Sequence, residues 1–347
     1  MSILERAINK QQGPKAADHQ EEPANSNVRY IEELVGSSAD ENGIGDGAGV
    51  EENSEELFAF GDLMAKGDDG NALGDILEGA GVLTREQVDD VLRVQDEENL
   101  YFGEAALKLK YISTDELNLA LAKQYGYEYL SPKNASLSKE LVAVYKPFSK
   151  QSEVLRSIRS GLVVNALDKG LNVIAGFSPG KSEGKSYALA NLAILFSQLN
   201  KRVLLIDANF RSPRLHDIFN FDPRIGLSAI LGGRLSKEGF EKLPETLEAF
   251  SNVSLLGAGP MPPNPSELLS NPRLHLFIKQ LRKIYDVILI DTPSAEFKSD
   301  IQFVSQCVDA AVILCRKNKT NMSAYKNLRS FCNHVSLPIA GVIYNEY

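Results

Sequence analysis

The stretch Asn172–Phe196 constrains the fold of this chain more than any other part of the sequence. It opens as an apolar run of strand-forming residues, crosses the loop SPGKSEGKS (Ser178–Ser186), and continues as an apolar run that suits a helix. A strand that enters a helix through such a loop directs several backbone N–H groups and the positive end of the helix dipole toward one point. The order strand, loop, helix therefore predicts a phosphate-binding loop.

The end of this loop, Gly184-Lys185-Ser186, supplies the side chains that a nucleotide site of this kind needs. Lys185 is expected to bridge the β- and γ-phosphates, and the Ser186 hydroxyl to bind Mg²⁺. The strict GxxxxGK[ST] pattern fails at its first glycine, where Pro179 stands. We expect Mg-ATP as the ligand, bound by Gly180, Lys181, Ser182, Glu183, Gly184, Lys185, Ser186 and Tyr187.

Two further apolar runs end in an aspartate. Asp207 follows the strand-like run in KRVLLIDANFRSPR, and Asp291 follows the one in YDVILIDTPS. Ligands of open α/β sheets bind at the carboxyl ends of the strands, so both carboxylates are expected at the phosphate site. Asp291 is predicted to hold Mg²⁺ through water, and Asp207 to polarise an attacking hydroxyl. The predicted metal site is Ser186, Asp207 and Asp291.

Short β-rich runs alternate with helical stretches from Glu140 onward, which indicates an α/β fold with a mostly parallel sheet covered by helices on both faces. The runs are Asn172–Phe177, Val203–Ile206, Val253–Gly257, Val287–Ile290, Ala311–Cys315 and Ile339–Tyr344. We predict a P-loop nucleotide-binding domain at 140–347. A small all-α domain and a disordered acidic tail precede it.

The all-α domain, at 71–133, contains an internal repeat. Gly74–Gln95 aligns with Gly103–Gln124 at an offset of 29 residues, and each copy is expected to form a short helix, a turn and a longer helix. Each longer helix is predicted to start at a capping box, Thr84 with Gln87 and Ser113 with Glu116. Two such hairpins can bury their apolar stripes against each other.

The first 70 residues carry 16 acidic and 5 basic side chains, a net charge of −11. They are expected to be a mostly disordered tail with a short N-terminal helix (Ser2–Lys10) and an apolar island (Leu57–Met64). Either segment is a candidate for docking, and the alternative is a solvated tail. The remaining 30 acidic and 32 basic side chains nearly balance, which argues against a nucleic-acid partner.

Cysteine usage and hydropathy bear on location. Cys307, Cys315 and Cys332 show no metal-ligand spacing and fit a reducing cytosol. No apolar run approaches the ~18 residues of a membrane-spanning helix. We therefore expect a soluble, cytoplasmic protein, with any association with the inner membrane made through a partner.

Together these motifs resemble the deviant-Walker P-loop group that includes MinD and ParA. Within it the chain is similar to the bacterial tyrosine kinases of capsule and exopolysaccharide assembly, in particular their cytoplasmic chain-length-determinant kinases. Ser178–Ser186 matches the family's SPxxGEGK[ST] loop with Ser182 in place of a glycine, and Ile206–Arg214 matches its second Walker motif. Gly259–Pro272 matches its PPNPxELL segment, and Glu153, Arg156 and Arg159 match its ExxRxxR helix.

The resemblance implies an ATP-dependent protein-tyrosine kinase that autophosphorylates and regulates exopolysaccharide chain length, polymerisation or export. It also implies self-association into a homo-oligomer through Glu153, Arg156 and Arg159, and a membrane chain-length-determinant (polysaccharide co-polymerase) protein as partner. Asn345 matches an asparagine that related ATPases place near the adenine.

Two departures from the family weaken the kinase interpretation. The second acid of its DxDxR motif is Asn209, which we keep in the predicted catalytic set with Lys185, Asp207 and Asp291. The tyrosine-rich tail is absent; Tyr344 is expected on a buried strand, which leaves Tyr347 as the accessible acceptor. The alternative is a catalytically weak, nucleotide-switched ATPase scaffold of the export machinery.

The repeat resembles the N-terminal domain of type II secretion ATPases, including the variety that binds cyclic di-GMP. Ala72 and Tyr101 occupy its two arginine positions, and Lys110 replaces a glycine. Without the guanidinium groups the main partners of the phosphates are missing, so cyclic di-GMP is not expected and a protein-interaction or vestigial module is favoured.

Overall fold

The computed structural model describes residues 69–127, 129–130, 137–222, 224–234, 243–247 and 250–346. The predictions for the acidic tail, for its segments Ser2–Lys10 and Leu57–Met64, and for Tyr347 lie outside these residues. The described chain forms two compact units that meet in sequence at Ser157 and Ile158, and each is considered by itself.

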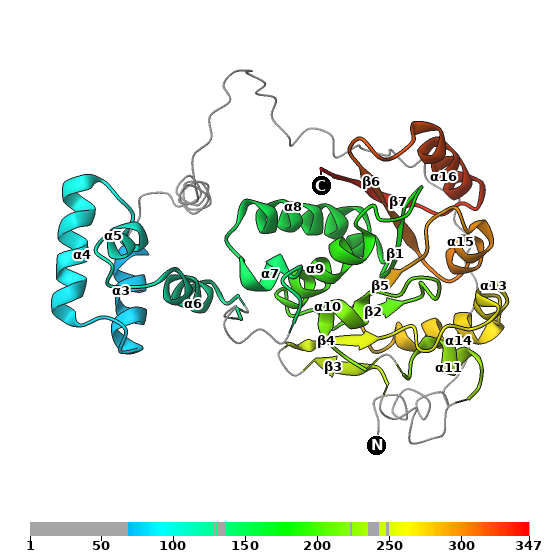
Figure 1. Ribbon diagram of the computed structural model, residues 1–347, viewed down its shortest axis with the longest axis horizontal. Helices are drawn as coiled ribbons and strands as arrows, with labels where there is room; N and C mark the ends of the chain where they lie inside the picture. Colours follow the sequence, from blue (N-terminus) through cyan, green and yellow to red (C-terminus); the bar gives the residue numbers. More distant parts are fainter. Residues whose placement is uncertain are drawn as a thin grey trace. The chain divides into compact units, whose positions relative to one another are not determined.

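The first unit is helical. Its helices are α3 (Asp69–Gly79), α4 (Arg85–Glu98), α5 (Phe102–Lys108), α6 (Thr114–Tyr125) and α7 (Val142–Tyr145), and α8 (Lys150–Asn165) begins in it and continues into the second unit (Figure 1). Both predicted capping boxes form. The Thr84 hydroxyl accepts from the Gln87 backbone N–H at 3.3 Å, and the Ser113 hydroxyl accepts from that of Glu116 at 3.3 Å.

The two repeats pack their helices in the same way. A Cβ atom at Gly74 of α3 would lie 3.2 Å from the Val88 side chain of α4, and one at Gly103 of α5 would lie 2.8 Å from Leu117 of α6. Gly103 and Leu117 are the repeat equivalents of Gly74 and Val88. Glycine at this position lets the short helix lie close to the apolar stripe of the longer helix. A larger side chain there would press against the valine or leucine of that stripe and push the two helices apart. The sequence repeat therefore encodes a repeated packing contact.

The second unit contains a seven-stranded sheet in the order β3-β4-β2-β5-β1-β6-β7. Its strands are β1 (Val173–Phe177), β2 (Val203–Asp207), β3 (Glu245–Leu247), β4 (Phe250–Leu256), β5 (Val287–Asp291), β6 (Ala310–Arg316) and β7 (Ile339–Asn345). Every neighbouring pair is parallel except β3 with β4. All residues of β1, β2 and β5 are buried, as unbroken apolar strands at the centre of a covered sheet should be. The predicted fold class is confirmed.

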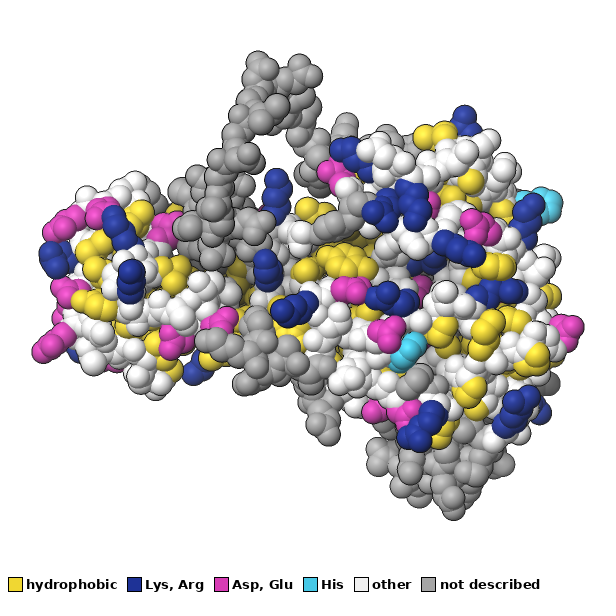
Figure 2. All heavy atoms as spheres, in the orientation of Figure 1, with side chains coloured by type: hydrophobic (Ala, Val, Ile, Leu, Met, Phe, Trp, Pro, Cys, Tyr) yellow, Lys and Arg dark blue, Asp and Glu magenta, His cyan; other side chains and the backbone are white. Residues whose placement is uncertain are grey.

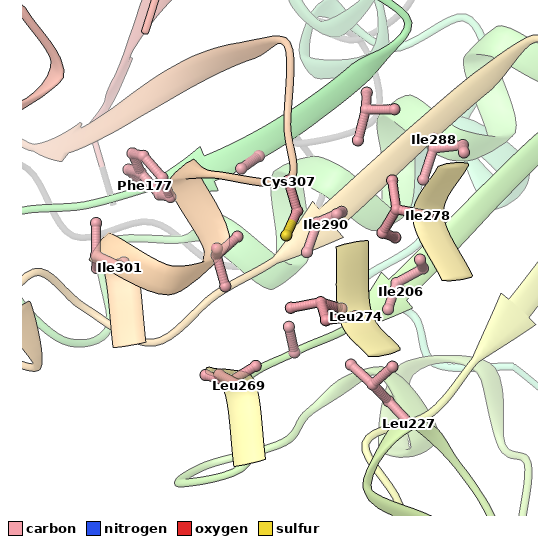
Figure 3. Close-up of a cluster of buried hydrophobic side chains, with 14 of the residues drawn as sticks. Phe177, Ile206, Leu227, Leu269, Leu274, Ile278, Ile288, Ile290, Ile301 and Cys307 are labelled. Carbon is pink, nitrogen blue, oxygen red and sulfur yellow. The ribbon is translucent and has the colours of Figure 1, made fainter. Parts of the chain in front are cut away.

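Helices cover both faces of this sheet. Among the described residues, the helices after α8 are η2 (Leu167–Lys169), α9 (Lys185–Ser197), α10 (Leu215–Phe219), α11 (Leu227–Leu231), α13 (Pro265–Leu269), α14 (Pro272–Leu281), α15 (Lys298–Ser305) and α16 (Met322–His334). The core on one face joins Ile206, Ile288 and Ile290 to residues of α11, α13, α14 and α15 (Figure 3). The other face is covered by α9, which packs across β1, β2, β4 and β5.

The surface of the described residues carries charges of both signs. On the face drawn in Figure 2, lysine and arginine side chains are interspersed with aspartate and glutamate. Across the helices in the described ranges, none combines the length and the apolar character needed to cross a membrane.

Candidate active site

The loop between β1 and α9 turns tightly around Lys185. Ser182 and Gly184 both have positive φ, 55° and 93°, which reverses the backbone twice within a short span. Lys185, the first residue of α9, donates from Nζ to the Ser178 hydroxyl at 2.7 Å, and that hydroxyl donates to the Gly180 carbonyl at 2.6 Å. The lysine therefore folds back over its own loop, in the place where a phosphate group would be held.

A buried glutamate fixes the loop from within. Glu183 accepts a hydrogen bond from the Gly180 backbone N–H at 2.9 Å and another from the Thr320 hydroxyl. The Asn345 amide at the end of β7 donates to the Glu183 carbonyl at 3.4 Å. Gly184 has a φ of 93°, a conformation that residues with a Cβ atom rarely adopt, and a Cβ atom there would also lie 2.4 Å from that amide. Thr320, in the turn after β6, and Asn345, at the end of β7, thus set the shape of the loop.

Basic side chains at the end of β6 and in the turn after it also contact the loop. Arg316 and Lys319 donate to the Ser182 carbonyl at 3.3 and 3.4 Å. Sequence reasoning missed Thr320, Arg316 and Lys319, because nothing local marks them as neighbours of the loop. The predicted Asn345 does lie against it.

The two strand-end carboxylates lie side by side. In the sheet register Asp207 pairs with Asp291, and both side chains are fully buried. The Ser186 hydroxyl donates to Asp291 Oδ2, whereas Asp291 Oδ1 is buried without a hydrogen-bond partner among the described residues. Such an orphaned oxygen is costly and indicates a ligand that is not part of the chain.

The donor set at this point suits magnesium. Mg²⁺ prefers oxygen ligands, keeps several waters and is commonly held by one or two carboxylates together with substrate phosphates. In the described residues no three or more His, Cys, Asp or Glu side chains group together to hold a metal alone. A metal that the phosphates help to bind needs few protein ligands. The Ser186 hydroxyl and the Asp291 oxygen that has no hydrogen-bond partner within the described ranges are enough for such a site.

Burial dominates the electrostatics of the site. It raises the pKa of Asp207, and repulsion from Asp291 raises it further, while backbone N–H groups of Asn209, Arg214 and Leu215 at 3.0 to 3.2 Å oppose the shift. Burial likewise raises the pKa of Asp291, against the opposing charge of Lys185. A divalent cation would relieve the cost of keeping both carboxylates ionised.

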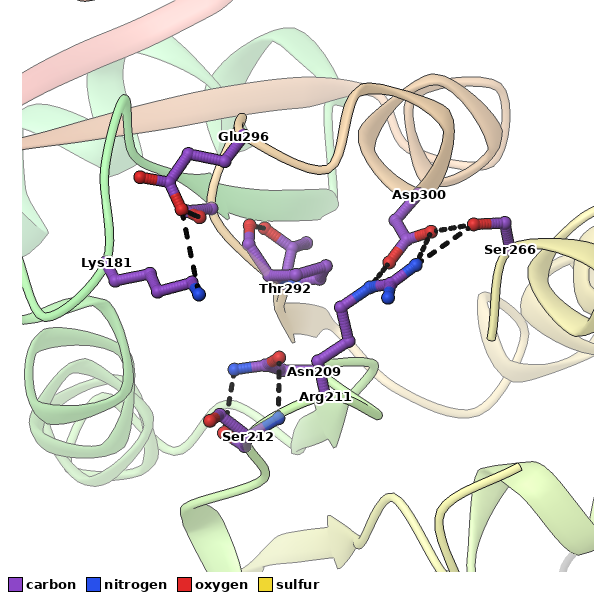
Figure 4. Close-up of polar contacts among 10 residues, drawn as sticks. Lys181, Asn209, Arg211, Ser212, Ser266, Thr292, Glu296 and Asp300 are labelled. Atoms are coloured by element: carbon purple, nitrogen blue, oxygen red, sulfur yellow. Dashed lines mark hydrogen bonds and ion pairs between the residues drawn. The ribbon is translucent and has the colours of Figure 1, made fainter. Parts of the chain in front are cut away.

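Asn209 is committed to its own loop. Its Nδ2 donates to the Ser212 carbonyl at 2.8 Å, and its Oδ1 accepts from the Ser212 backbone N–H at 3.2 Å (Figure 4). The amide thus closes a turn and brings no charge to the site.

Arg211, in the second Walker motif, contacts the PPNPxELL segment and the region of α15. Its Nε donates to Asp300 Oδ2 at 2.7 Å, and its Nη2 donates to the Ser266 hydroxyl at 3.2 Å (Figure 4). Its guanidinium carbon lies 4.1 Å from the Phe297 ring centroid. Ser266 belongs to the predicted PPNPxELL segment and Asp300 to α15. This network gives a physical reason for that segment to accompany the second Walker motif. Asp300 and Phe297 were not identified from the sequence.

Lys181 points toward the loop after β5. Its Nζ lies 3.9 Å from Glu296 Oε2 (Figure 4). It also lies 5.1 Å from the Phe297 ring centroid. The Ser294 hydroxyl donates to Glu296 Oε2 at 3.3 Å. Tyr187, in the first turn of α9, is half-buried and its carbonyl accepts from Asn191 at 2.9 Å.

The residues of the ExxRxxR segment lie on α8. Arg156 donates to the Pro147 carbonyl at 2.6 Å and its guanidinium lies 5.2 Å from the Tyr127 ring centroid. Arg159 donates to the Leu195 carbonyl of α9 at 3.0 Å. Both arginines therefore make contacts within the chain.

The prediction that Tyr344 is buried is wrong. Its side chain is 59% exposed, because β7 is an edge strand and only one of its sides is paired. Tyr344 is thus an accessible tyrosine of the described residues.

Comparisons with known proteins point to one group. No family model matches the chain. It is 31% identical to tyrosine-protein kinase YwqD of Bacillus subtilis, over 54% of this chain and 78% of that protein. It is 33% identical to tyrosine-protein kinase wzc of Salmonella typhimurium over 60% of this chain, but spans only 28% of that longer protein. Among solved structures, the chimerical protein CapA2B2 matches 65% of this chain and 97% of its own, with a TM-score of 0.56 and 26% identity.

Proposed function

The chain belongs to the family of bacterial tyrosine-protein kinases, and from that membership we propose that it transfers the γ-phosphoryl group of ATP to tyrosine hydroxyls. In this proposal neighbouring copies of the chain phosphorylate one another, and the activity regulates exopolysaccharide chain length, polymerisation or export. The observation that carries the proposal is the meeting of Lys185, Ser186 and Asp291 at one edge of the sheet, with one carboxylate oxygen left for a ligand.

The residues of the site have separate roles in this proposal. The phosphates bind the loop through Gly180, Lys181, Ser182, Glu183, Gly184, Lys185, Ser186 and Tyr187, and Asn345 lies near the adenine. Ser186, Asp207 and Asp291 hold Mg²⁺, which would neutralise charge on the phosphates. Lys185 stabilises the transferred phosphoryl group, and Asp207 polarises the acceptor. Asn209 holds the loop after β2 in place through Ser212.

The proposed partners follow the family. We propose self-association through Glu153, Arg156 and Arg159 on α8, and a membrane chain-length-determinant protein as the second partner. That partner would keep the chain at the cytoplasmic side of the inner membrane. The similar structure CapA2B2 is a chimerical protein, which supports a search for a second polypeptide as partner of this chain.

A second candidate function is a nucleotide-switched scaffold that binds ATP and transfers phosphate poorly. The neutral Asn209, tied to Ser212, favours it, because a carboxylate there would add charge beside the metal. In this alternative ATP binding controls assembly and no phosphotyrosine accumulates.

One assay separates the two candidates. Pure full-length protein is incubated with Mg-ATP, and phosphotyrosine is quantified beside ATP binding measured by calorimetry. The kinase proposal expects a signal that Lys185→Met abolishes, since the lysine contacts the phosphates. A wild-type signal no higher than that of Lys185→Met, with ATP binding intact, would leave the scaffold. Asn209→Asp then tests whether the missing charge is responsible.

A further inference from the structure

We propose that the helical unit restrains self-association of the chain, because its Tyr127 holds Arg156 of the ExxRxxR segment. The partner that competes for this arginine is a second copy of the chain. The inference rests on the proposed self-association through α8 and adds a regulatory contact to it. Tyr127 and Arg156 both belong to the unit that ends at Ser157, so the contact lies within one compact unit.

Arg156 is engaged within its own chain. Its Nη1 donates to the Pro147 carbonyl at 2.6 Å, and its guanidinium carbon lies 5.2 Å from the Tyr127 ring centroid. A guanidinium placed over an aromatic ring is attracted to it. Burial lowers the pKa of Arg156, so the guanidinium is partly withdrawn from water. The side chain is therefore held against the chain's own surface.

The ring that receives this guanidinium belongs to an aromatic cluster, formed by Tyr125, Tyr127 and Phe148. The ring centroids of Tyr127 and Phe148 lie 5.8 Å apart, and that of Tyr125 lies 6.3 Å from each of them. Phe148 also packs against the buried core of helices α3 to α6. Tyr125 is the last residue of α6. The aromatic cluster thus connects Arg156 to the helical repeats.

Hydrogen bonds fix the start of α8 beside this cluster. The hydroxyl groups of Ser149 and Ser152 donate to the Lys146 carbonyl at 2.8 and 2.7 Å. Ser152 is fully buried. The turn that carries Pro147 is therefore well defined, and Arg156, one helical turn after Ser152, meets the Pro147 carbonyl in a set position.

A second copy of the chain would compete for the same guanidinium. Arginine binds a carboxylate through a planar fork, with two parallel hydrogen bonds. In Arg156 one donor already serves Pro147 and the ring of Tyr127 lies against the guanidinium. The neighbouring Val154 is 51% exposed, so α8 presents a surface to solvent beside the held arginine.

The restraint follows from how a held state affects binding. When only a fraction of the molecules is competent to bind, the apparent affinity falls by that fraction. Chains in which Arg156 has left Tyr127 are the competent fraction for self-association. Removal of the ring should therefore strengthen self-association, although it adds no contact between the copies.

Sedimentation velocity tests this expectation. It gives the Kd of self-association for full-length wild type and variants without nucleotide, so phosphorylation does not change during the run. Tyr127→Leu and Tyr127→Met both remove the ring and should associate about 3- to 10-fold more tightly than wild type. Tyr127→Phe is the matched control. It keeps the ring beside Arg156 and should associate as wild type does.

Arg156→Gln separates the restraint from the interface itself, because it should weaken self-association. If the two ring-free variants associate like wild type or more weakly while Arg156→Gln weakens association, the restraint is refuted and the proposed interface stands. Tyr127→Phe associating as tightly as Tyr127→Leu also refutes it. If Arg156→Gln associates as tightly as wild type, or if every variant stays monomeric, the proposed self-association fails and the inference with it.

Discussion

Asp207 and Asp291 determine how the site responds to pH, because two buried carboxylates occupy paired positions on adjacent strands. Asp207 accepts three backbone hydrogen bonds, and even so burial leaves its pKa raised. Without a bound cation, the folded chain therefore keeps a proton on Asp207 that the unfolded chain would release. Cation binding has to displace that proton, so Mg²⁺ affinity is expected to rise with pH.

Stability without nucleotide should fall as pH rises. Asp207 titrates near ~3.9 when unfolded, and burial raises its pKa to about 8 in the fold. Between these values the folded chain binds more protons than the unfolded one, so the stabilisation is complete below about pH 4 and is lost toward pH 8. The midpoint of thermal unfolding in EDTA should drop from pH 5 to pH 7.5.

Asp207→Asn provides the comparison for this pH dependence. It cannot ionise, so its midpoint should change less over the same interval, whatever its absolute value. Burial lowers the pKa of Lys185, so the titration of this lysine makes stability rise as pH increases in the alkaline range. The interval therefore stops at pH 7.5. An equal slope in wild type and variant would contradict the assignment.

At the scale of elements, the Arg211 network fixes how α13 and α15 meet the end of β2. Asp300 is almost fully buried on α15, and its oxygens contact both Arg211 and Ser266. Removing one partner of a buried ion pair leaves an uncompensated charge. The loop after β2, which carries part of the site, is therefore held to α13 and α15 by this network.

Arg211→Met should be strongly destabilising. We expect a loss of about 2–3 kcal/mol in the free energy of unfolding, below the ~3–5 kcal/mol of a fully buried pair, because part of Arg211 is exposed. Chemical denaturation measures it. The matched control is Arg202→Met, which breaks a similar two-point pair with Asp286 at the surface and should cost less than about 1 kcal/mol. Equal losses would refute a structural role specific to the Arg211 network.

Elements and motifs were largely predictable from the sequence, because the signals for them are local. The parallel strands, both capping boxes and the phosphate loop each follow from residues close together in the chain. The antiparallel β3 was missed, since its three residues are too short a pattern to read.

Long-range contacts were not predictable in the same way. Thr320, Asp300 and Glu296 are ordinary residues at ordinary spacings, and only the folded chain brings them to the site. The exposure of Tyr344 depends on β7 being an edge strand, which is a property of strand order and not of local sequence. The turn made by Asn209 with Ser212 likewise depends on side-chain orientation.

At the scale of the whole molecule, the contacts that shape the phosphate loop come from the unit that begins at Ile158. The helical unit contributes none of the side chains placed at the site above. Nucleotide binding should therefore be independent of the N-terminal part of the chain.

A fragment of residues 137–347 tests this independence. It keeps α7 and α8 whole and omits α3 to α6. Its Kd for Mg-ATP, measured by calorimetry, should lie within about threefold of that of the full chain, and Lys185→Met in the fragment should abolish binding. A tenfold weaker affinity in a folded fragment would show that the helical unit contributes to the site.

The position of β7 has a consequence for the order in which the site is completed during synthesis. The phosphate loop is translated well before Asn345, the residue at the end of β7 that packs against Gly184. The central strand β1 likewise waits for β5 and β6, which follow it by more than a hundred residues. Because a chain leaves the ribosome from its N-terminus, the loop emerges before the residues that shape it, and an mRNA truncated before β7 should yield a product that ATP protects less from proteases than the full chain.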